Sequence, residues 1–230
     1  MTLTLYHHPF CPLSRAVRIA FGEYGLGAGF IEERVWERRR EFLAMNPAGT
    51  LPVLQDGETL ACGARAIGEY LDETRGAGLG DRRLLPVDSA ERAEVRRLLD
   101  WFEIKFNEEV TAYMAGEKIY KRFMPAGDGS NAPDARLIKA ASTNIRYHMR
   151  YIGHLAERRN WLAGERFSLA DIAAAAQLSV IDYLGDVPWE DFQPAKEWYA
   201  RVKSRPAFRP LLVDHIAGMP PSRTYVDLDF

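Results

Sequence analysis

The sequence has little cysteine, no marked excess of either charge and no long apolar run, and each shortage excludes a class of protein. Its two cysteines, Cys11 and Cys62, match neither a disulfide framework nor a metal-ligand spacing, so a reducing compartment and no metal site are predicted. The formal net charge of -2 gives a nucleic-acid partner no electrostatic support. No apolar run reaches the ~20 residues of a membrane span, and the first residues lack a secretory pattern. A cytoplasmic protein is therefore predicted.

Strand-like alternation is also missing from most of the chain, and apart from the last few residues it is confined to the first third. Alternating residues 2–8 and 30–36 predict two strands, and residues 51–61 predict a hairpin. Apolar residues at helical spacing predict one helix after the first strand and another after the hairpin. The expected order is therefore β-α-β followed by β-β-α, which indicates an α/β domain of residues 1–78.

From about residue 86 onward the pattern is helical almost throughout. Helices are predicted over residues 88–114, 138–155, 168–184, 195–204 and 207–216. The helix over residues 168–184 is apolar nearly all round, which is typical of a buried central helix. An all-helical domain of residues 87–217 is therefore expected, after a linker rich in glycine and charge.

The final segment, residues 218–230, is predicted to be an extended tail. Pro220 and Pro221 prevent the last helix from continuing. After them the chain alternates, with Val226, Leu228 and Phe230 on one side and Tyr225, Asp227 and Asp229 on the other. Such a segment is typical of peptides that bind a sheet edge or a groove. Two alternatives stay open, because the tail either covers its own domain or is bound by a second partner.

Three stretches, taken in order, resemble the cytosolic glutathione transferases. "YHHPFCPLSRAVRIAF" is similar to the family's first strand and active-site turn, "NPAGTLPVL" to its cis-proline segment, and "FSLADIAAA" to the cap of its central helix. The resemblance implies the glutathione transferase fold, with an N-terminal thioredoxin-like domain and a C-terminal helical domain. It also implies a homodimer, for which Leu84, Leu85 and Trp101 are a predicted contact.

Two of these stretches have a physical interpretation of their own. As N-cap, the Ser168 hydroxyl can accept a hydrogen bond from the Asp171 backbone N–H, while the Asp171 carboxylate accepts one from the Ser168 N–H. That role is structural. Pro52 is expected to follow a cis peptide bond, which leaves the backbone of Leu51 free to pair with an extended peptide. The resemblance implies that this peptide is the cysteinyl unit of glutathione.

The glutathione site is, however, incomplete. In the family, the helix after the hairpin opens with an acid and a serine that bind the γ-glutamyl group at the helix N-terminus. Gly63 and Ala64 stand in their places here. Two charge-assisted contacts of about 1.5–3 kcal/mol each are therefore missing, which amounts to roughly 100-fold or more in affinity. A vestigial cleft of Leu51, Pro52, Gly63 and Ala64 is predicted, and no cofactor.

Cys11 is the candidate for any remaining chemistry. It precedes a helix start, and a helix N-terminus favours the thiolate. Ser14 occupies the position of the second cysteine of a CxxC motif, so chemistry with two protein thiols is excluded. The alternative function is therefore a cysteine-type glutathione S-transferase or glutathione-dependent thiol transferase that acts through Cys11, with Ser14 close by. Cys62 is predicted to be a core residue.

Within the family, the resemblance is closest to the FtsZ-binding, glutathione-transferase-like division proteins of alphaproteobacteria. It implies a non-catalytic cytoplasmic adaptor at the division site that binds the tubulin-like GTPase FtsZ and promotes constriction. It also implies that Trp36 and Glu117 belong to an FtsZ-binding surface and that Asp227 and Leu228 belong to a tail needed for division, with a second division protein as the tail's partner. Trp36 beside Arg38–Arg40 is itself typical of an interface hot spot.

Overall fold

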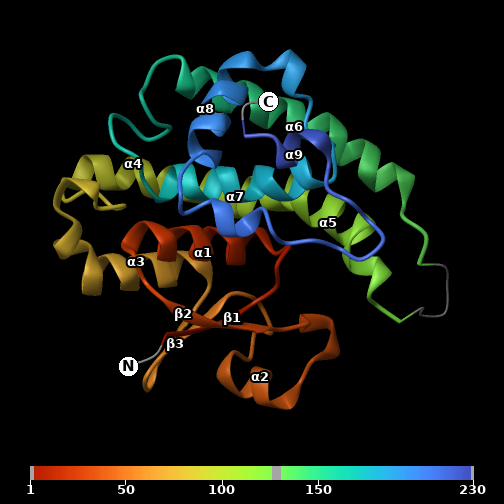
Figure 1. Cartoon of the computed structure of the whole chain (residues 1–230), viewed down its shortest axis with the longest axis horizontal. Helices are drawn as coiled ribbons and strands as arrows, with labels where there is room; N and C mark the ends of the chain where they lie inside the picture. The colour runs from red at the N-terminus through yellow and green to blue at the C-terminus, as the bar shows by residue number, and fades with distance from the viewer. Residues whose placement is uncertain (1–2, 126–130, 229–230) are drawn as a thin grey trace.

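The structure, a computed structural model, describes residues 3–125 and 131–228 (Figure 1). The first part of the chain is a sheet with helices on both faces. Its elements are β1 (Leu3–His7), α1 (Pro12–Tyr24), β2 (Ala28–Glu32), η1 (Val35–Glu37), α2 (Arg40–Met45), β3 (Val53–Asp56), β4 (Thr59–Cys62) and α3 (Ala64–Arg75). Figure 1 shows α1 and α3 between the sheet and the helical domain, and α2 on the other side of the sheet.

The sheet has the strand order β2-β1-β3-β4. β1 pairs parallel with β2 through the crossover helix α1, whereas β1–β3 and β3–β4 are antiparallel. Gly57, at φ 62°, makes the turn of the β3–β4 hairpin. The Leu51–Pro52 peptide is cis. This arrangement brings the end of β1 and the start of α1 beside the segment that enters β3.

Helices make up the second part of the chain. Its elements are η2 (Gly76–Arg82), α4 (Ser89–Leu99), η3 (Asp100–Thr111), α5 (Ala112–Lys118), η4 (Tyr120–Arg122), α6 (Ala135–Ala156), α7 (Leu169–Tyr183), η5 (Trp189–Asp191), α8 (Gln193–Lys203), η6 (Arg209–Leu211) and α9 (Arg223–Val226). No helix among the described residues combines the length and the apolarity that crossing a membrane would require. The predicted fold class, a thioredoxin-like sheet followed by helices, is confirmed.

A π-helical stretch lies in the middle of the long helix formed by α4, η3 and α5. The wider π turn brings every fourth residue to the same face, and the apolar residues follow that spacing. Leu98, Phe102, Phe106, Val110 and Met114 are all buried. Tyr113, which a period of 3.6 places in the stripe, is exposed instead. The π turns therefore set which side chains of this long helix are buried.

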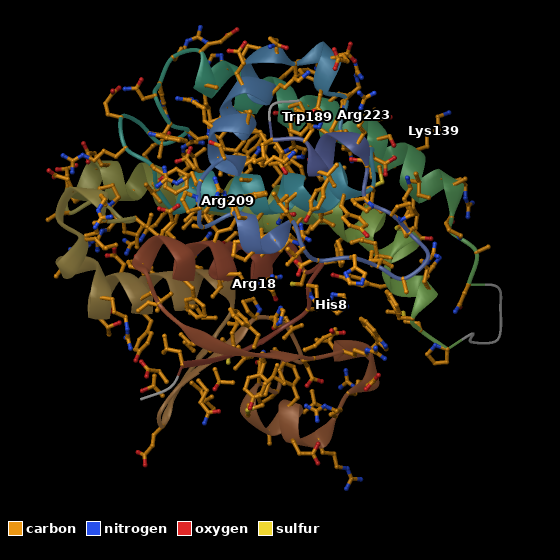
Figure 2. All side chains as sticks on the ribbon, in the orientation of Figure 1. His8, Arg18, Lys139, Trp189, Arg209 and Arg223 are labelled. Carbon is orange, nitrogen blue, oxygen red and sulfur yellow. The ribbon has the colours of Figure 1, made fainter. Side chains whose placement is uncertain are left out.

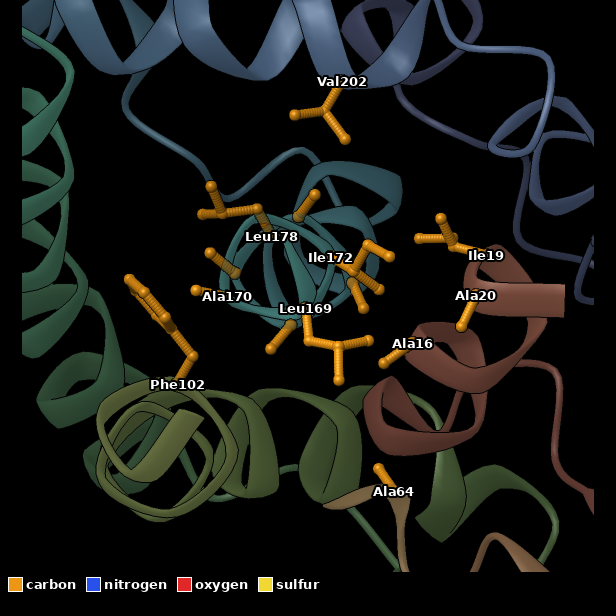
Figure 3. Packing of buried hydrophobic residues seen from close by; sticks show 14 of the residues in the cluster. Ala16, Ile19, Ala20, Ala64, Phe102, Leu169, Ala170, Ile172, Leu178 and Val202 are labelled. Atoms are coloured by element: carbon orange, nitrogen blue, oxygen red, sulfur yellow. The ribbon is translucent and has the colours of Figure 1, made fainter. Parts of the chain in front are cut away.

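The core is centred on α7, which is buried along its whole length (Figure 3). Around it lie residues of α1, η3 and α8, among them Ala16, Phe102 and Val202. Its first turn carries a complete capping box, in which Ser168 and Asp171 bond each other's backbone N–H. Further bonds to the Asp171 carboxylate come from the Leu162 N–H at 2.9 Å and the Trp198 indole at 2.9 Å. The cap thus joins α7 to the loop before it and to α8.

Several local predictions are corrected by the packing. The helix expected over residues 207–216 is reduced to the single turn η6, where Pro206 and Pro210 interrupt the backbone. Leu84 and Leu85 are buried within the chain and do not face outward, because the Leu85 N–H reaches the buried Asp72. Cys62 is exposed and is not a core residue, since β4 is an edge strand.

The tail is not extended throughout. Ser222 caps the short helix α9, and the turn places Tyr225 inside at 0% exposure while Val226 points outward at 56%. The predicted extended alternation is therefore wrong at Tyr225 and Val226, where the chain forms a helical turn with Tyr225 in the core and Val226 outside. The reason is polar satisfaction, because the Tyr225 hydroxyl finds partners in the core that Val226 lacks. Phe230 and Asp229 lie outside the described residues.

Candidate functional site

A cleft of about 310 Å³ lies where the sheet domain meets the helical domain. We call it the Trp36 cleft. Its lining consists of His8, Cys11, Pro12, Leu13, Glu33, Val35, Trp36, Gly49, Thr50, Leu51, Asn107, Thr111, Ala112, Ala115 and Tyr120. The lining is mostly apolar, and the buried Thr111 hydroxyl has no hydrogen-bond partner among the described residues. Such a cleft can accept an apolar group.

Three aromatic rings from distant parts of the sequence form one wall. His8 follows β1, Trp36 lies in η1 and Tyr120 lies in η4. The ring centroids are 5.6 Å apart for His8 and Trp36, 5.2 Å for His8 and Tyr120, and 5.7 Å for Trp36 and Tyr120. Figure 2 shows His8 at the junction of the sheet and the helices. Trp36 is therefore half-buried, held on one side and available on the other.

His7 and His8, at the end of the first strand, are buried. No function was predicted for either of them. Burial, reinforced by the nearby Arg34 and Arg15, lowers the pKa of His8 to about 4. Burial and Arg18 lower the pKa of His7 to about 4. The Phe10 N–H donates to His8 Nδ1 at 3.2 Å, so the proton of the neutral ring lies on Nε2. Both imidazoles are neutral in the folded protein at neutral pH.

Acidification is expected to destabilise the protein partly through His8. The unfolded chain takes up a proton near pH 6.5, whereas folded His8 stays neutral until about pH 4. Its contribution is therefore complete above pH ~6.5 and is lost as the pH falls, by about 1–2 kcal/mol at pH 5. His8→Asn, which keeps an acceptor near Nδ1, should flatten the pH dependence of urea unfolding between pH 7 and 5. His215→Asn, at an exposed histidine, serves as the control, and equal slopes in both variants would contradict this prediction.

The surroundings of the Cys11 thiol bear on the alternative function, which requires a reactive sulfur. Burial raises the pKa of Cys11, although the neighbouring Ser14 and the Leu13 backbone act in the opposite direction and favour the thiolate. The α1 N-terminus is therefore not sufficient to activate the sulfur, because the surrounding apolar groups disfavour its charge. Cys11 lines the Trp36 cleft, whereas Ser14 is buried in α1 and is absent from its lining. The geometry gives little support to thiol chemistry.

The predicted vestigial glutathione cleft coincides with the Trp36 cleft only at Leu51, because Pro52, Gly63 and Ala64 do not line it. Leu51 lines the cleft, and the Gly63 N–H donates to the carbonyl of Pro52 at 2.9 Å. Gly63 is the N-cap of α3, with no side-chain cap and no acid in the first turn. Ala64 begins the helix and is buried. The predicted loss of the γ-glutamyl contacts at Gly63 and Ala64 stays a prediction.

Glu117 is buried rather than part of an exposed charged surface. Its carboxylate accepts hydrogen bonds from the Asp134 N–H at 2.6 Å and from Lys121 at 2.5 Å. Although burial opposes it, these two bonds keep the pKa of Glu117 below its usual value. Asp134 is the N-cap of α6. Glu117 therefore ties the start of α6 to the end of α5, one turn before Tyr120, and its predicted contact with a partner stays a prediction.

The tail residues lie on a different part of the molecule from the Trp36 cleft. Asp227 is exposed and Leu228 half-buried, and Leu228 borders a shallow surface hollow formed mainly by α8. Lys203 donates to the backbone carbonyls of Thr224 and Asp227, which fixes the tail as far as Asp227. The roles predicted for Asp227, Leu228 and Phe230 stay predictions.

The residues that sequence reasoning missed are His8, Tyr120 and Glu33. Glu33 has a fully buried carboxylate, paired with Arg39 at 2.5 Å, which fixes the segment that carries Trp36. No signal in the sequence pointed to it, because Glu33 stood within the strand predicted over residues 30–36, whereas β2 ends at Glu32. In the sequence, Tyr120 stands among Lys118, Lys121 and Arg122, a pattern typical of a solvated helix face. Only the approach of η4 to the end of β1 gives it a role.

Two family models match the sequence, one in each part of the chain. The model described as "Glutathione S-transferase, N-terminal domain" matches residues 5–78, and the "Glutathione S-transferase, C-terminal domain" model matches residues 123–206. Together with the cis-proline frame and the capped central helix, these matches identify the class. The chain belongs to the glutathione S-transferase family.

Individual relatives cover nearly the whole chain. FtsZ-localized protein A of Caulobacter vibrioides is 48% identical, over 99% of this chain and 98% of its own length. The solved structure of FzlA from C. crescentus superposes with a TM-score of 0.91 at 47% identity and full coverage of both chains. A glutathione S-transferase structure from Sinorhizobium meliloti 1021 superposes with a TM-score of 0.97 at 51% identity, also with full coverage of both. The predicted resemblance is thereby confirmed.

Proposed function

We propose that this chain is a non-catalytic adaptor of cell division that binds FtsZ and promotes constriction. The observation that carries the proposal is the near full-length similarity, at 48% identity, to a relative named FtsZ-localized protein A. The missing acid and serine at Gly63 and Ala64 and the buried thiol of Cys11 support the absence of glutathione chemistry. The Trp36 cleft supplies a half-buried aromatic residue in an apolar hollow, which suits a protein partner.

The proposal extends to the assembly and to the place of action. We place the chain at the division site as a homodimer, with Trp36 and Glu117 on the FtsZ-binding side. The tail, with Asp227, Leu228 and Phe230, binds a second division protein. Because Glu117 is buried, its contribution is to hold η4 and Tyr120 in position, and the direct contact comes from Trp36.

Co-sedimentation with polymerised FtsZ tests the proposal. The purified chain is expected to pellet with FtsZ in the presence of GTP and to stay in the supernatant when FtsZ is kept unassembled with GDP. A chain that stays in the supernatant at all FtsZ concentrations tested would overturn the adaptor function. Light scattering on the same sample measures the oligomeric state, and a mass near 26.1 kDa would contradict the homodimer.

Glutathione-dependent enzymology is the second candidate, favoured by the family and by the description of the S. meliloti structure as a glutathione S-transferase. The two functions differ in glutathione affinity. The chain is expected to show no saturable glutathione binding at millimolar ligand by calorimetry, because two charge-assisted contacts are absent. A dissociation constant in the micromolar range would contradict the adaptor-only proposal and favour catalysis through Cys11.

The variant Gly63→Glu/Ala64→Ser is the matched gain-of-binding control. It should bind glutathione better than the parent, since it restores the acid and the hydroxyl beside Leu51 and Pro52. Gly63 has φ 88°, a conformation that costs a non-glycine residue on the order of 1–2 kcal/mol. We therefore expect Ala64→Ser alone to provide most of the gain.

A further inference from the structure

Tyr225 anchors the tail in the core through both its hydroxyl and its ring. The hydroxyl donates to the carbonyl of Leu211 at 2.6 Å and accepts from Arg15 Nη2 at 3.2 Å. The ring packs edge-on against Tyr183, with centroids 5.1 Å apart. Ser222 holds the turn by accepting from the Tyr225 N–H at 3.1 Å. The anchor is therefore a defined contact rather than a loose cover.

Arg15 carries the contact from the tail to the start of α1. The Arg15 side chain is fully buried, and its Nε donates to the carbonyl of Pro9 at 2.6 Å. The other guanidinium nitrogens donate to the Ser179 hydroxyl at 2.9 Å and to Asp214 at 3.3 Å. Because the guanidinium is planar, its donors are oriented together. A change at Tyr225 therefore alters the orientation of the donor that holds Pro9.

Phe10 provides a second, apolar connection over the same path. Its ring lies 4.6 Å from Tyr183 between centroids, and the Arg15 guanidinium carbon lies 4.7 Å from the centre of the Phe10 ring. The same Tyr183 ring contacts Tyr225. Phe10, Tyr183 and Tyr225 belong to one small buried cluster at the end of α7, distinct from the main core. A displacement of Tyr225 is therefore transmitted to Phe10 through packing as well as through Arg15.

The segment that Arg15 and Phe10 hold is a wall of the Trp36 cleft. The Phe10 carbonyl accepts from the Tyr120 hydroxyl at 3.0 Å, and the Phe10 N–H donates to His8. His8 and Tyr120 are the two rings against which Trp36 packs. The path from the tail to the cleft is thus continuous, and each step is a hydrogen bond or a ring contact.

We infer that Tyr225 is a positioning residue for the Trp36 cleft, which it stabilises through Arg15 and Phe10. The inference rests on the proposed function insofar as FtsZ is the ligand of the cleft. It assigns the tail two separate parts, because Tyr225 supports the cleft from inside whereas the residues after it are available to another partner. Release of the tail anchor therefore weakens ligand binding in the Trp36 cleft, although no tail residue lines the cleft.

Tyr225→Phe tests the inference, because it removes only the hydroxyl and keeps the ring. With 5-fluorotryptophan incorporated, the ¹⁹F signal of Trp36 is assigned as the one missing from Trp36→Phe. Tyr225→Phe is expected to move this signal by more than its linewidth and to weaken co-sedimentation with FtsZ about threefold to thirtyfold. Tyr24→Phe is the matched control, since its buried hydroxyl bonds Asp72 at 3.4 Å near the other end of α1. It should leave both readouts unchanged.

A double-mutant cycle with Tyr120→Phe separates transmission from general loosening. If the coupling passes through the Phe10 carbonyl, the two substitutions give a combined change in the Trp36 signal smaller than the sum of the single changes. Additive changes, or a Trp36 signal unmoved by Tyr225→Phe, would overturn the inference. If the parent does not bind FtsZ at all, the proposed function fails, and the ¹⁹F signal alone still decides the role of Tyr225.

Discussion

Trp36→Ala is expected to weaken binding to polymerised FtsZ by at least about thirtyfold, which corresponds to ≥2 kcal/mol. The ring is half-buried, supported by His8 and Tyr120 on one side, and lines an apolar cleft on the other. A pre-positioned aromatic side chain loses little entropy on binding, so its truncation removes most of its contact energy. Quantitative co-sedimentation over a range of FtsZ concentrations measures the effect.

The fold is expected to tolerate Trp36→Ala with a loss of no more than about 1.5 kcal/mol, since only part of the ring is packed. Trp161→Ala is the matched control. Trp161 is also half-buried, packs on Phe167 at 4.9 Å and lies under Arg201 at 4.8 Å, outside the Trp36 cleft. It should lower the melting temperature similarly and leave FtsZ binding intact. If Trp36→Ala melts lower yet pellets like the parent, Trp36 is a packing residue and the interface lies elsewhere.

Asp171→Ala is expected to cost about 3–5 kcal/mol of unfolding free energy. The carboxylate is fully buried and accepts hydrogen bonds from Leu162, Trp198 and both the backbone and the hydroxyl of Ser168. Alanine leaves these donors unpaired in a core that water does not reach. Urea unfolding followed by circular dichroism measures the loss.

Asp88→Ala is the control for the capping role alone. Asp88 caps α4 by accepting from the N–H groups of Ala90 and Glu91, both at 2.9 Å, in an exposed position. Water replaces those bonds, so we expect a cost of only ~1 kcal/mol. Asp171→Asn keeps the shape and one acceptor and should cost less than alanine, which gives a measurable protein if Asp171→Ala does not fold. Equal losses at Asp88 and Asp171 would show that burial adds nothing to the cap.

Although α2 and α9 were missed, the order of the strands, most of the helices, the cap of α7 and the cis peptide bond before Pro52 could be predicted from the sequence. Each depends on neighbours within a few residues, for which residue type and spacing are sufficient evidence. The absence of the acid and serine at Gly63 and Ala64 is likewise a local fact. The π-helical middle of the long helix was hinted at by apolar residues every four positions, but a period of 3.6 fits short stretches nearly as well.

The burial of charged and aromatic groups could not be predicted, because it is decided by partners far away in the chain. In the sequence, Glu117 stands among charged residues typical of a solvated helix face. In the structure it is buried, and the Asp134 N–H donates to its carboxylate. Tyr120 gained a role only through the carbonyl of Phe10, 110 residues earlier.

The sequence by itself determined the family and the fold, a thioredoxin-like sheet followed by helices, and it predicted an incomplete glutathione site. Only the tertiary structure decided that Trp36 packs with His8 and Tyr120, and that the tail turns Tyr225 inward. The physical reason is the same in both cases. Hydrophobic spacing reports which face of an element is buried, whereas a buried polar group must find its hydrogen-bond partner wherever the fold brings one within reach.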